Sequence, residues 1–237
     1  MSSSPSRRFP VAVNAEALAL AWARQEAAQA GSVVIVDHEI SPRGRLGRLW
    51  PHPAERTAVL AAVWRPTLDA ERADLVWLGA SLGLLTAARS LVAAEVGLWW
   101  PDGIVTEDTR RFGEVRAEIQ LGPGRVVSAV VTARLHLDHL GLPDREDVLA
   151  AMIEGLQEGA LTLDAEQDAV CSAYVASHSL TGRIVTARLL PRGAVRGTVG
   201  GVDDHGQLEL VSSTGLVERV PVDNLDRLEI ATPLMRS

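Results

Sequence analysis

The residues best suited to chemistry lie in one segment, Arg43-Gly44-Arg45-Leu46-Gly47-Arg48-Leu49-Trp50, which holds three arginines and two glycines. Arginine donates paired hydrogen bonds to phosphate or carboxylate groups. Glycine lets a backbone turn closely around a ligand, and tryptophan offers a flat face to an aromatic ring. This pattern indicates an anion-binding loop, for example for a nucleotide, and a solvated arginine-rich loop is the alternative interpretation.

Other residues of types found in active sites are weaker candidates. His136 and His139 stand three residues apart, as in some metal sites, but one such pair supplies too few ligands. His178 lies between two serines without a nucleophile turn, so residues 177–179 are interpreted as a linker. Cys171 falls in a helical stretch, residues 165–176, where packing is a better interpretation than reactivity. The arginine-rich loop is therefore the candidate site.

The loop lies between two predicted strands. Residues 32–37 are a short apolar, β-branched run that predicts a buried strand, and residues 57–64 predict another. A helix is expected over residues 15–30, with Asn14 as a candidate N-cap and Gly31 as its stop. Further along, the pattern predicts a buried helix over 74–96, paired strands over 115–121 and 125–137, and an amphipathic helix over 144–156.

The composition changes near Leu180, and this change predicts a second domain. From residue 182 to 230, short β-type runs alternate with glycine-containing turns, which predicts a small all-β barrel of about five strands. We place the first domain over residues 11–179 and the second over 180–237. Residues 1–10 are rich in serine, proline and arginine and are predicted to be disordered.

Composition and charge narrow the functional classes. The net charge of −7 over 237 residues, without a basic run, argues against nucleic-acid binding. The longest apolar runs fall far short of the roughly 20 residues that span a membrane. A single cysteine excludes an internal disulfide, and the N-terminus lacks a secretory signal, so we predict a cytoplasmic protein. All 23 basic residues are arginine, so no reaction step can use a lysine amine of this chain.

The arginine-rich loop resembles the phosphate-binding loop GRGRxGRxW of the biotin–protein ligases, with Pro42 in place of the first glycine. Trp99-Trp100-Pro101-Asp102-Gly103 is similar to that family's KWPND segment, and Val13-Asn14 stands where the family has a Ser-Thr-Asn element. Segments similar to the family's SH3-like end domain are 180–183, 197–203 and 206–208. The resemblance runs in unbroken order over residues 11–230 and points to a short ligase without a DNA-binding domain.

This resemblance implies an α+β fold, in which a mixed sheet with packed helices precedes a small SH3-like barrel. It implies that ATP and Mg²⁺ activate biotin, or a related carboxylic acid, as an acyl-adenylate with release of pyrophosphate. A lysine of a carrier protein would then take the acyl group. The first step brings a carboxylate toward a polyphosphate, so it needs positive charge at the site.

Carried over residue by residue, the resemblance implies two catalytic residues. Arg111 stands where the family has its catalytic lysine, and Asp102 is the carboxylate that remains for Mg²⁺. The residues implied to bind ligand are Asn14, Glu39, Arg43, Gly44, Arg45, Gly47, Trp50, Trp100 and His136.

Several positions depart from the family pattern. Glu39 replaces a glutamine that contacts biotin, where a carboxylate is expected to repel biotin's own carboxylate or to select a cationic ligand. Glu114 and Arg116 replace small or apolar residues, and Leu135-His136 replaces a Gly-x-Asn segment beside the ligand. Arginine in place of the catalytic lysine keeps the charge but not its geometry.

Two functions of different classes follow from this pattern. One is an adenylate-forming ligase with altered substrate or reduced activity, which passes an acid to a protein lysine or another amine. The other is a non-catalytic homologue that keeps the fold to bind a ligand or a partner protein. Members of the family often pair through sheet edges, so a homodimer is an open alternative. No helix-turn-helix is expected ahead of the first ligase-like element, because about ten residues precede it.

Overall fold

The structure, a computed structural model, describes residues 5–141 and 144–231. Its larger sheet has seven strands in the order β1-β2-β3-β7-β6-β5-β4. The strands are β1 (Ser6–Ala12), β2 (Val33–Glu39), β3 (Thr57–Trp64), β4 (Val96–Trp99), β5 (Gly103–Thr106), β6 (Arg111–Gly122) and β7 (Arg125–His136). β1 pairs with β2 in parallel, and the other neighbours are antiparallel. The predicted mixed sheet is confirmed.

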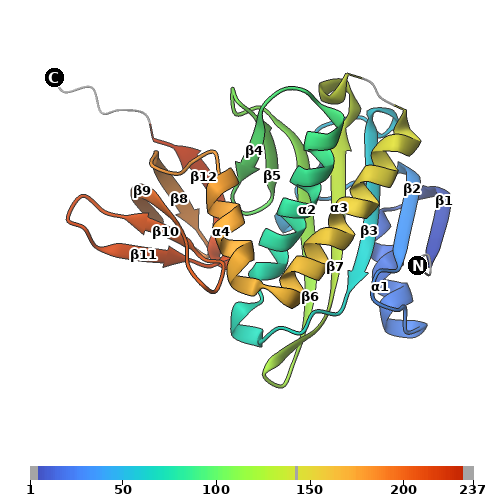
Figure 1. Cartoon of the computed structure of the whole chain (residues 1–237), viewed down its shortest axis with the longest axis horizontal. Helices are drawn as coiled ribbons and strands as arrows, with labels where there is room; N and C mark the ends of the chain where they lie inside the picture. Colours follow the sequence, from blue (N-terminus) through green and yellow to red (C-terminus); the bar gives the residue numbers. More distant parts are fainter. Residues whose placement is uncertain (1–4, 142–143, 232–237) are drawn as a thin grey trace.

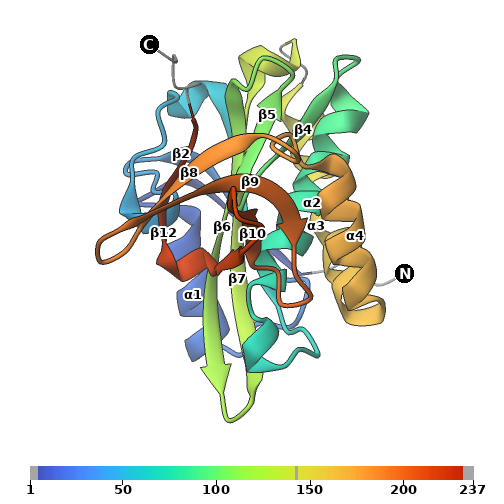
Figure 2. The same cartoon turned by 90° about the vertical axis from the view of Figure 1, so that its left-hand side faces the viewer.

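Helices cover both faces of this sheet (Figures 1 and 2). α1 (Ala15–Gln25) packs on one face, and α2 (Leu75–Leu91) and α3 (Arg145–Ala165) pack on the other. β3 is buried along its whole length, so alternate residues of its apolar run enter the two opposite cores. Double burial explains why the sequence here is continuously apolar rather than alternating.

A second sheet follows α4 (Gln167–Ser177) and has five antiparallel strands in the order β11-β10-β9-β8-β12. They are β8 (Ile184–Leu189), β9 (Ala194–Val202), β10 (Leu208–Val211), β11 (Val217–Val220) and β12 (Leu225–Ile230). In the residues that the structure describes, the edge strands β11 and β12 are not paired with each other. The five predicted strands are therefore present as an open sheet in the place of the small barrel.

Element boundaries show where local pattern reading succeeds. β3 has the predicted bounds, and Asn14 caps α1, since its side chain accepts a hydrogen bond from the Ala17 amide at 2.8 Å. α1 is shorter than predicted and ends at Gln25, and α2 ends at Leu91 because the chain turns there into β4. α3 is longer than predicted. No helix in residues 5–141 and 144–231 is long and apolar enough to cross a membrane.

The predicted disorder of residues 1–10 is wrong for residues 6–10, which belong to β1. Residues 1–4 lie outside the described part of the chain. The segment is ordered because its backbone pairs with β2, and because Arg8 contacts Asp37 at 2.7 Å and Glu146 at 2.6 Å. Such partners are distant in sequence, so composition alone cannot indicate them.

α2 and α3 pack closely through glycines spaced four apart. Gly79 and Gly83 in α2 face Gly159 and Gly155 in α3. A Cβ atom built on Gly155 would lie 2.2 Å from the carbonyl oxygen of Gly83, and one on Gly83 would lie 2.3 Å from the carbonyl of Gly155. The obstructing atoms belong to backbone, which cannot rotate aside as a side chain does.

Substitution Gly155→Ala is therefore expected to push the two helices apart and to lower the free energy of unfolding by about 1–3 kcal/mol. Gly79→Ala is the matched control on the same interface, since its Cβ would meet its nearest atom at 3.4 Å. That variant should be neutral or stabilised, because alanine favours a helix by about 1 kcal/mol over glycine. Urea denaturation of both variants checks the prediction, which fails if Gly155→Ala is as stable as the control.

Candidate functional site

The arginine-rich loop is a closed turn between β2 and β3. The Gly44 amide donates to the Arg48 carbonyl at 2.8 Å, and the Trp50 amide donates to the Pro42 carbonyl at 3.2 Å. Leu46 and Gly47 have positive φ angles of 57° and 70°. Glycine adopts such angles without steric cost, which explains the residue type at position 47. The loop thus has one defined backbone conformation.

The two predicted catalytic residues, Arg111 and Asp102, pair with each other, and Asp102 also pairs with Arg45 of the loop. Both oxygens of the buried Asp102 carboxylate face arginines: Arg111 pairs with Oδ1, and Arg45 Nε lies 3.3 Å from Oδ2. Arg45 also donates to the backbone carbonyls of Leu225, and of Asp226 at 2.9 Å, at the start of β12. The Asp102 carboxylate predicted to assist Mg²⁺ is engaged by two guanidinium groups.

A second group of charges lies on the α1 face of the sheet. Arg134, with an exposed fraction of 0%, donates from Nε and Nη2 to the two oxygens of Glu39 at 2.9 and 3.1 Å. Its Nη1 reaches Glu114 Oε1 at 3.2 Å and the carbonyl of Arg43 at 3.2 Å. Burial raises the pKa of Glu114, and the charge of Arg134 opposes that rise. We call Glu39, Arg134 and Glu114 the buried ion network.

Glu39 has partners within the protein. Its carboxylate pairs with Arg134 and also accepts a hydrogen bond from the Ala15 amide at 2.7 Å, so the effect expected of its charge on an acid or a cation stays a prediction. The adjoining cavity has a volume of about 10 Å³. It is lined by Asp37, Glu39, Pro42, Trp50, Ala54, Thr57 and Val59. A biotin-sized molecule does not fit in this space without a rearrangement.

Gly44 shows how closely the loop lies on the ion network. A Cβ atom on Gly44 would lie 2.5 Å from Glu114 Oε2, and Arg116 on the same strand donates to the Gly44 carbonyl at 3.3 Å. Arg116 also pairs with Glu16 of α1 at 2.8 Å. β6 therefore holds the loop through Glu114 and Arg116, two of the residues that differ from the family pattern.

The other predicted ligand-binding residues have structural partners. Arg43 is exposed and donates to the Gly47 carbonyl at 3.0 Å. Trp50 is buried under the loop, where its indole donates to Thr57 Oγ1 at 3.0 Å. Asn14 caps α1. His136 ends β7 and contacts two further histidines.

Trp100 is fully buried where the larger sheet meets the second sheet. Its indole nitrogen donates to the Gly206 carbonyl at 3.3 Å, and its amide donates to His178 Nε2 at 3.3 Å. Residues 177–179 are therefore more than a linker, because His178 is buried and holds this junction. Burial lowers the pKa of His178 to about 4.

Sequence reasoning missed Arg134, although a signal was present. It is a lone charged residue inside a long apolar strand, at a position that the strand's alternation places on a buried face. A buried arginine requires partners, so two carboxylates elsewhere were to be expected. Their identity depends on strand order, which the local pattern does not give.

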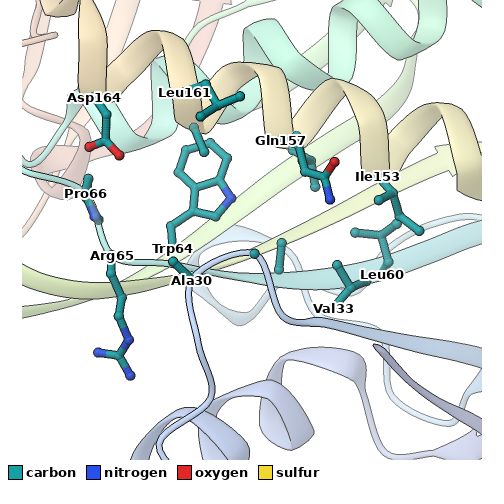
Figure 3. Close-up of a pocket in the computed structure, with 14 residues that line it drawn as sticks. Ala30, Val33, Leu60, Trp64, Arg65, Pro66, Ile153, Gln157, Leu161 and Asp164 are labelled. Carbon is teal, nitrogen blue, oxygen red and sulfur yellow. The ribbon is translucent and has the colours of Figure 1, made fainter. Parts of the chain in front are cut away.

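Another cavity, with a volume of about 280 Å³, lies on the opposite face of the sheet between β3 and α3 (Figure 3). Trp64 and Leu60 of β3 form its floor, and Ile153 and Leu161 of α3 lie above them. None of the residues predicted to bind ligand lines it.

Comparison with known proteins places this fold. No family model matches the chain. The biotin–[acetyl-CoA-carboxylase] ligase of Mycobacterium tuberculosis is 27% identical over 195 residues, which cover 75% of this chain and 72% of that protein. The structure of the biotin protein ligase from Aquifex aeolicus in complex with biotin and ATP matches with a TM-score of 0.78 and 15% identity, over 96% of this chain and 99% of that one.

This chain is a homologue of the biotin protein ligases. A biotin protein ligase-like protein of unknown function from Silicibacter sp. is also similar, with a TM-score of 0.73 and 16% identity over 94% of this chain and 96% of that one. The homologue thus has the fold of these ligases over nearly its whole length. The loop's central arginine is bound within the protein, and the buried ion network fills the space beside it.

Removal of the central cation of the network tests its importance. Arg134→Met leaves two buried carboxylates without their cation, so we expect a loss of about 3–5 kcal/mol in unfolding free energy at pH 7.5. The loss should shrink at acidic pH, because burial raises the pKa of Glu114 and this carboxyl then takes up a proton. Arg188→Met is the control, because the Arg188–Glu229 pair is exposed and worth less than about 1 kcal/mol. Equal stability of the two variants in urea denaturation would contradict the assignment.

The buried imidazole gives a prediction for pH. His178 has a folded pKa of about 4 and an unfolded pKa near 6.5, so its contribution is complete above pH 6.5 and is lost as the pH falls toward 4. From pH 7.5 to 4.5 the wild type should lose about 2–3 kcal/mol more than His178→Gln. Asp74, with a pKa raised to about 6, shifts in the opposite direction, so the difference between wild type and variant is the quantity to measure. Parallel pH profiles of the two proteins would refute the assignment.

Proposed function

We propose that this biotin protein ligase homologue does not form biotinyl-AMP and works by binding a partner protein. The observation that carries the proposal is Arg134, a fully buried guanidinium between two carboxylates, beside a cavity of about 10 Å³. To bind there, an acid would have to break contacts that leave a buried charge unpaired. That step costs several kcal/mol.

The loop supports the same proposal. Adenylate formation needs positive charge that is free to meet the phosphates. Arg45 is held by Asp102 and by two carbonyls of β12, and Arg48 pairs with Asp226 at 2.6 Å. The guanidinium donors of these two arginines are engaged within the protein. The chain also has no lysine to replace them.

Exposed apolar side chains provide a surface for a protein partner. Leu46 and Leu49 on the loop are 47% and 63% exposed, and Ile40 at its start is 66% exposed. Val11 and Val13 are 57% and 59% exposed, and the Val13 carbonyl accepts a hydrogen bond from the Ser41 amide, which places these valines beside Ile40. Apolar groups gathered on a surface mark interaction sites.

The partner that we favour is the biotin-accepting carrier domain of a carboxylase. The M. tuberculosis relative is named for ligation of biotin to acetyl-CoA carboxylase, so it acts on such a protein. A homologue that keeps the fold and exposes leucines on the loop retains the means to contact the same class of domain. Binding without acyl transfer would then be its function.

A second candidate is an adenylate-forming ligase for an acid smaller than biotin. The side chain of Arg111 is 40% exposed, and Arg43 is exposed on a loop whose backbone conformation is fixed. ATP with Mg²⁺ at Asp102 would require Asp102 to exchange at least one arginine for the metal. The acyl group would pass to a protein lysine or another amine.

Isothermal titration of the full chain separates these functions. We expect no heat from biotin, ATP or a non-hydrolysable biotinyl-AMP analogue, and binding of a biotin carboxyl carrier domain with a Kd on the order of 1–100 μM. Leu46→Asp with Leu49→Asp should weaken carrier binding by about tenfold or more, because the substitutions place charges in an apolar contact. Leu216→Asp, at a site 69% exposed in the turn before β11, is the control.

A triple variant tests why the analogue fails to bind. Glu39→Gln, Glu114→Ala and Arg134→Gly together remove the ion network without leaving an unpaired charge, and they open space beside the loop. Binding of the analogue to this variant alone would support the proposal. Nanomolar binding of the analogue to the wild type, about −12 kcal/mol, would overturn it. Binding of ATP without the biotin analogue would favour the second candidate.

A further inference from the structure

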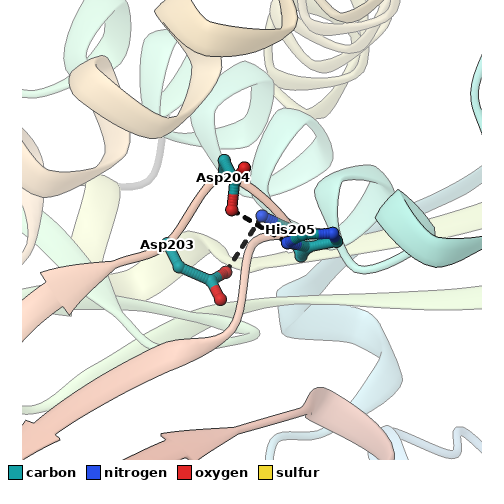
Figure 4. Close-up of side chains that lie close together, drawn as sticks. All are labelled: Asp203, Asp204 and His205. Atoms are coloured by element: carbon teal, nitrogen blue, oxygen red, sulfur yellow. Dashed lines mark hydrogen bonds and ion pairs between the residues drawn. The ribbon is translucent and has the colours of Figure 1, made fainter. Parts of the chain in front are cut away.

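The side chains of Asp203, Asp204 and His205 lie close together in the turn between β9 and β10 (Figure 4), with their ligand atoms within 4.8 Å of one another. All three have partners within the protein. Asp203 accepts hydrogen bonds from the amides of His205 and Gln207, each at 2.9 Å, and pairs with Arg219 at 3.2 Å. Asp204 contacts His205 Nδ1 at 2.8 Å. Turn geometry accounts for this cluster.

The cavity between β3 and α3 differs, because an indole N–H faces it without a partner. Trp64 of β3 is 3% exposed and lines the cavity, and its indole N–H donates to no acceptor among the residues that the structure describes. The buried indoles of Trp50 and Trp100, by comparison, donate to Thr57 and Gly206 at 3.0 and 3.3 Å. A buried tryptophan N–H usually has an acceptor, so the donor of Trp64 indicates where a ligand atom would bind.

The walls of the cavity are apolar apart from this donor and one amide. Figure 3 shows the Trp64 ring standing up from β3 toward α3, with its nitrogen on the side that faces Gln157. Leu60 and Val33 form the floor beyond the ring, and Ile153 of α3 closes the far end. The space therefore offers a flat aromatic wall and an aliphatic floor, which together suit an aromatic ring.

Charged side chains line the cavity at the other end, and both have partners. Asp164 accepts a hydrogen bond from the Thr67 amide at 2.8 Å. Arg65 donates from Nε and Nη2 to the Ala28 carbonyl at 3.2 and 3.1 Å, and its side chain extends away from α3 (Figure 3). The carboxylate of Asp164 is therefore the charge that remains at the cavity, and it disfavours an anionic ligand.

The volume of the cavity sets the size of the ligand. An apolar cavity of about 150 Å³ holds one benzene molecule, and the volume here is about 280 Å³. Two fused aromatic rings with a short substituent have a suitable size. A lining of apolar and aromatic side chains with a few polar groups is also typical of small-molecule sites.

We propose that the cavity between β3 and α3 binds a neutral bicyclic aromatic molecule that carries an acceptor oxygen, such as a ketone. Its rings pack beside the Trp64 indole and over Leu60, and its oxygen accepts the hydrogen bond of the Trp64 N–H. The site lies on the face of the sheet opposite the buried ion network, and it is independent of the partner surface on the loop.

The test is fluorescence titration of the full chain with prodan, a neutral naphthalene ketone whose emission moves to shorter wavelength in apolar surroundings. We expect saturation at one molecule per chain with a Kd on the order of 10 μM. Trp64→Phe keeps an aromatic ring and removes the N–H, so the Kd should rise about threefold to tenfold. Acetylnaphthalene should displace prodan at a lower concentration than the anion naphthoate, because of Asp164.

Two substitutions on α3 form a matched pair. Ala160 lines the cavity, so Ala160→Phe fills it and should weaken prodan binding by more than about tenfold. Glu158→Phe places the same side chain at an exposed position that does not line the cavity, and its Kd should equal that of the wild type. Leu46→Asp with Leu49→Asp should also bind prodan normally, which separates this site from the partner surface. Circular dichroism of each variant checks that it folds.

Absence of saturable prodan binding by the wild type would overturn the proposal. Equal affinity of the wild type and Ala160→Phe would also overturn it, because the probe would then bind elsewhere on the protein. An unchanged Kd in Trp64→Phe would do the same, since water would then be the partner of the N–H. Tighter binding of naphthoate than of acetylnaphthalene would contradict the neutral class of ligand.

Discussion

The constraint on which the site depends is that a guanidinium removed from water must keep its partners. Arg134 is fully buried, and its donors reach Glu39 on β2, Glu114 on β6 and the Arg43 carbonyl of the loop. The Arg134 side chain of β7 therefore connects β2, β6 and the arginine-rich loop. If the loop moved away from the sheet, Arg134 would lose the Arg43 carbonyl as an acceptor while its guanidinium remained buried, and this loss costs free energy.

The same chemistry holds the loop to the second sheet. Guanidinium groups that suit phosphate oxygens equally suit carboxylate and carbonyl oxygens, because the recognition rests on paired donors and charge. Arg45 donates hydrogen bonds to Asp102 and to the backbone of β12, and Arg48 donates to the carboxylate of Asp226. A loop motif typical of phosphate binding thus has a second structural use here, in which it joins the two sheets. Motif identity by itself does not distinguish the two uses.

Much of the fold could be predicted from the sequence, for identifiable reasons. β3 was predicted with its exact bounds because eight apolar residues between turn signals leave little choice. Asn14 was predicted as a cap because capping is local. β1 was missed because its order comes from pairing with β2. Arg134 and the meeting of His52 with His136 were missed because both depend on which strands become neighbours, and no local period encodes that.

In a ligand site without its ligand, some polar groups have no hydrogen-bond partner within the chain, and this lowers the stability of the fold. Partners that the chain itself supplies remove that cost. Glu39, Glu114 and Arg134 supply partners to one another, because each carboxylate forms an ion pair with the guanidinium. Asp102 and its two arginines do the same. The partners that surround a motif residue, and not its residue type alone, therefore decide whether its donors are free to meet a ligand.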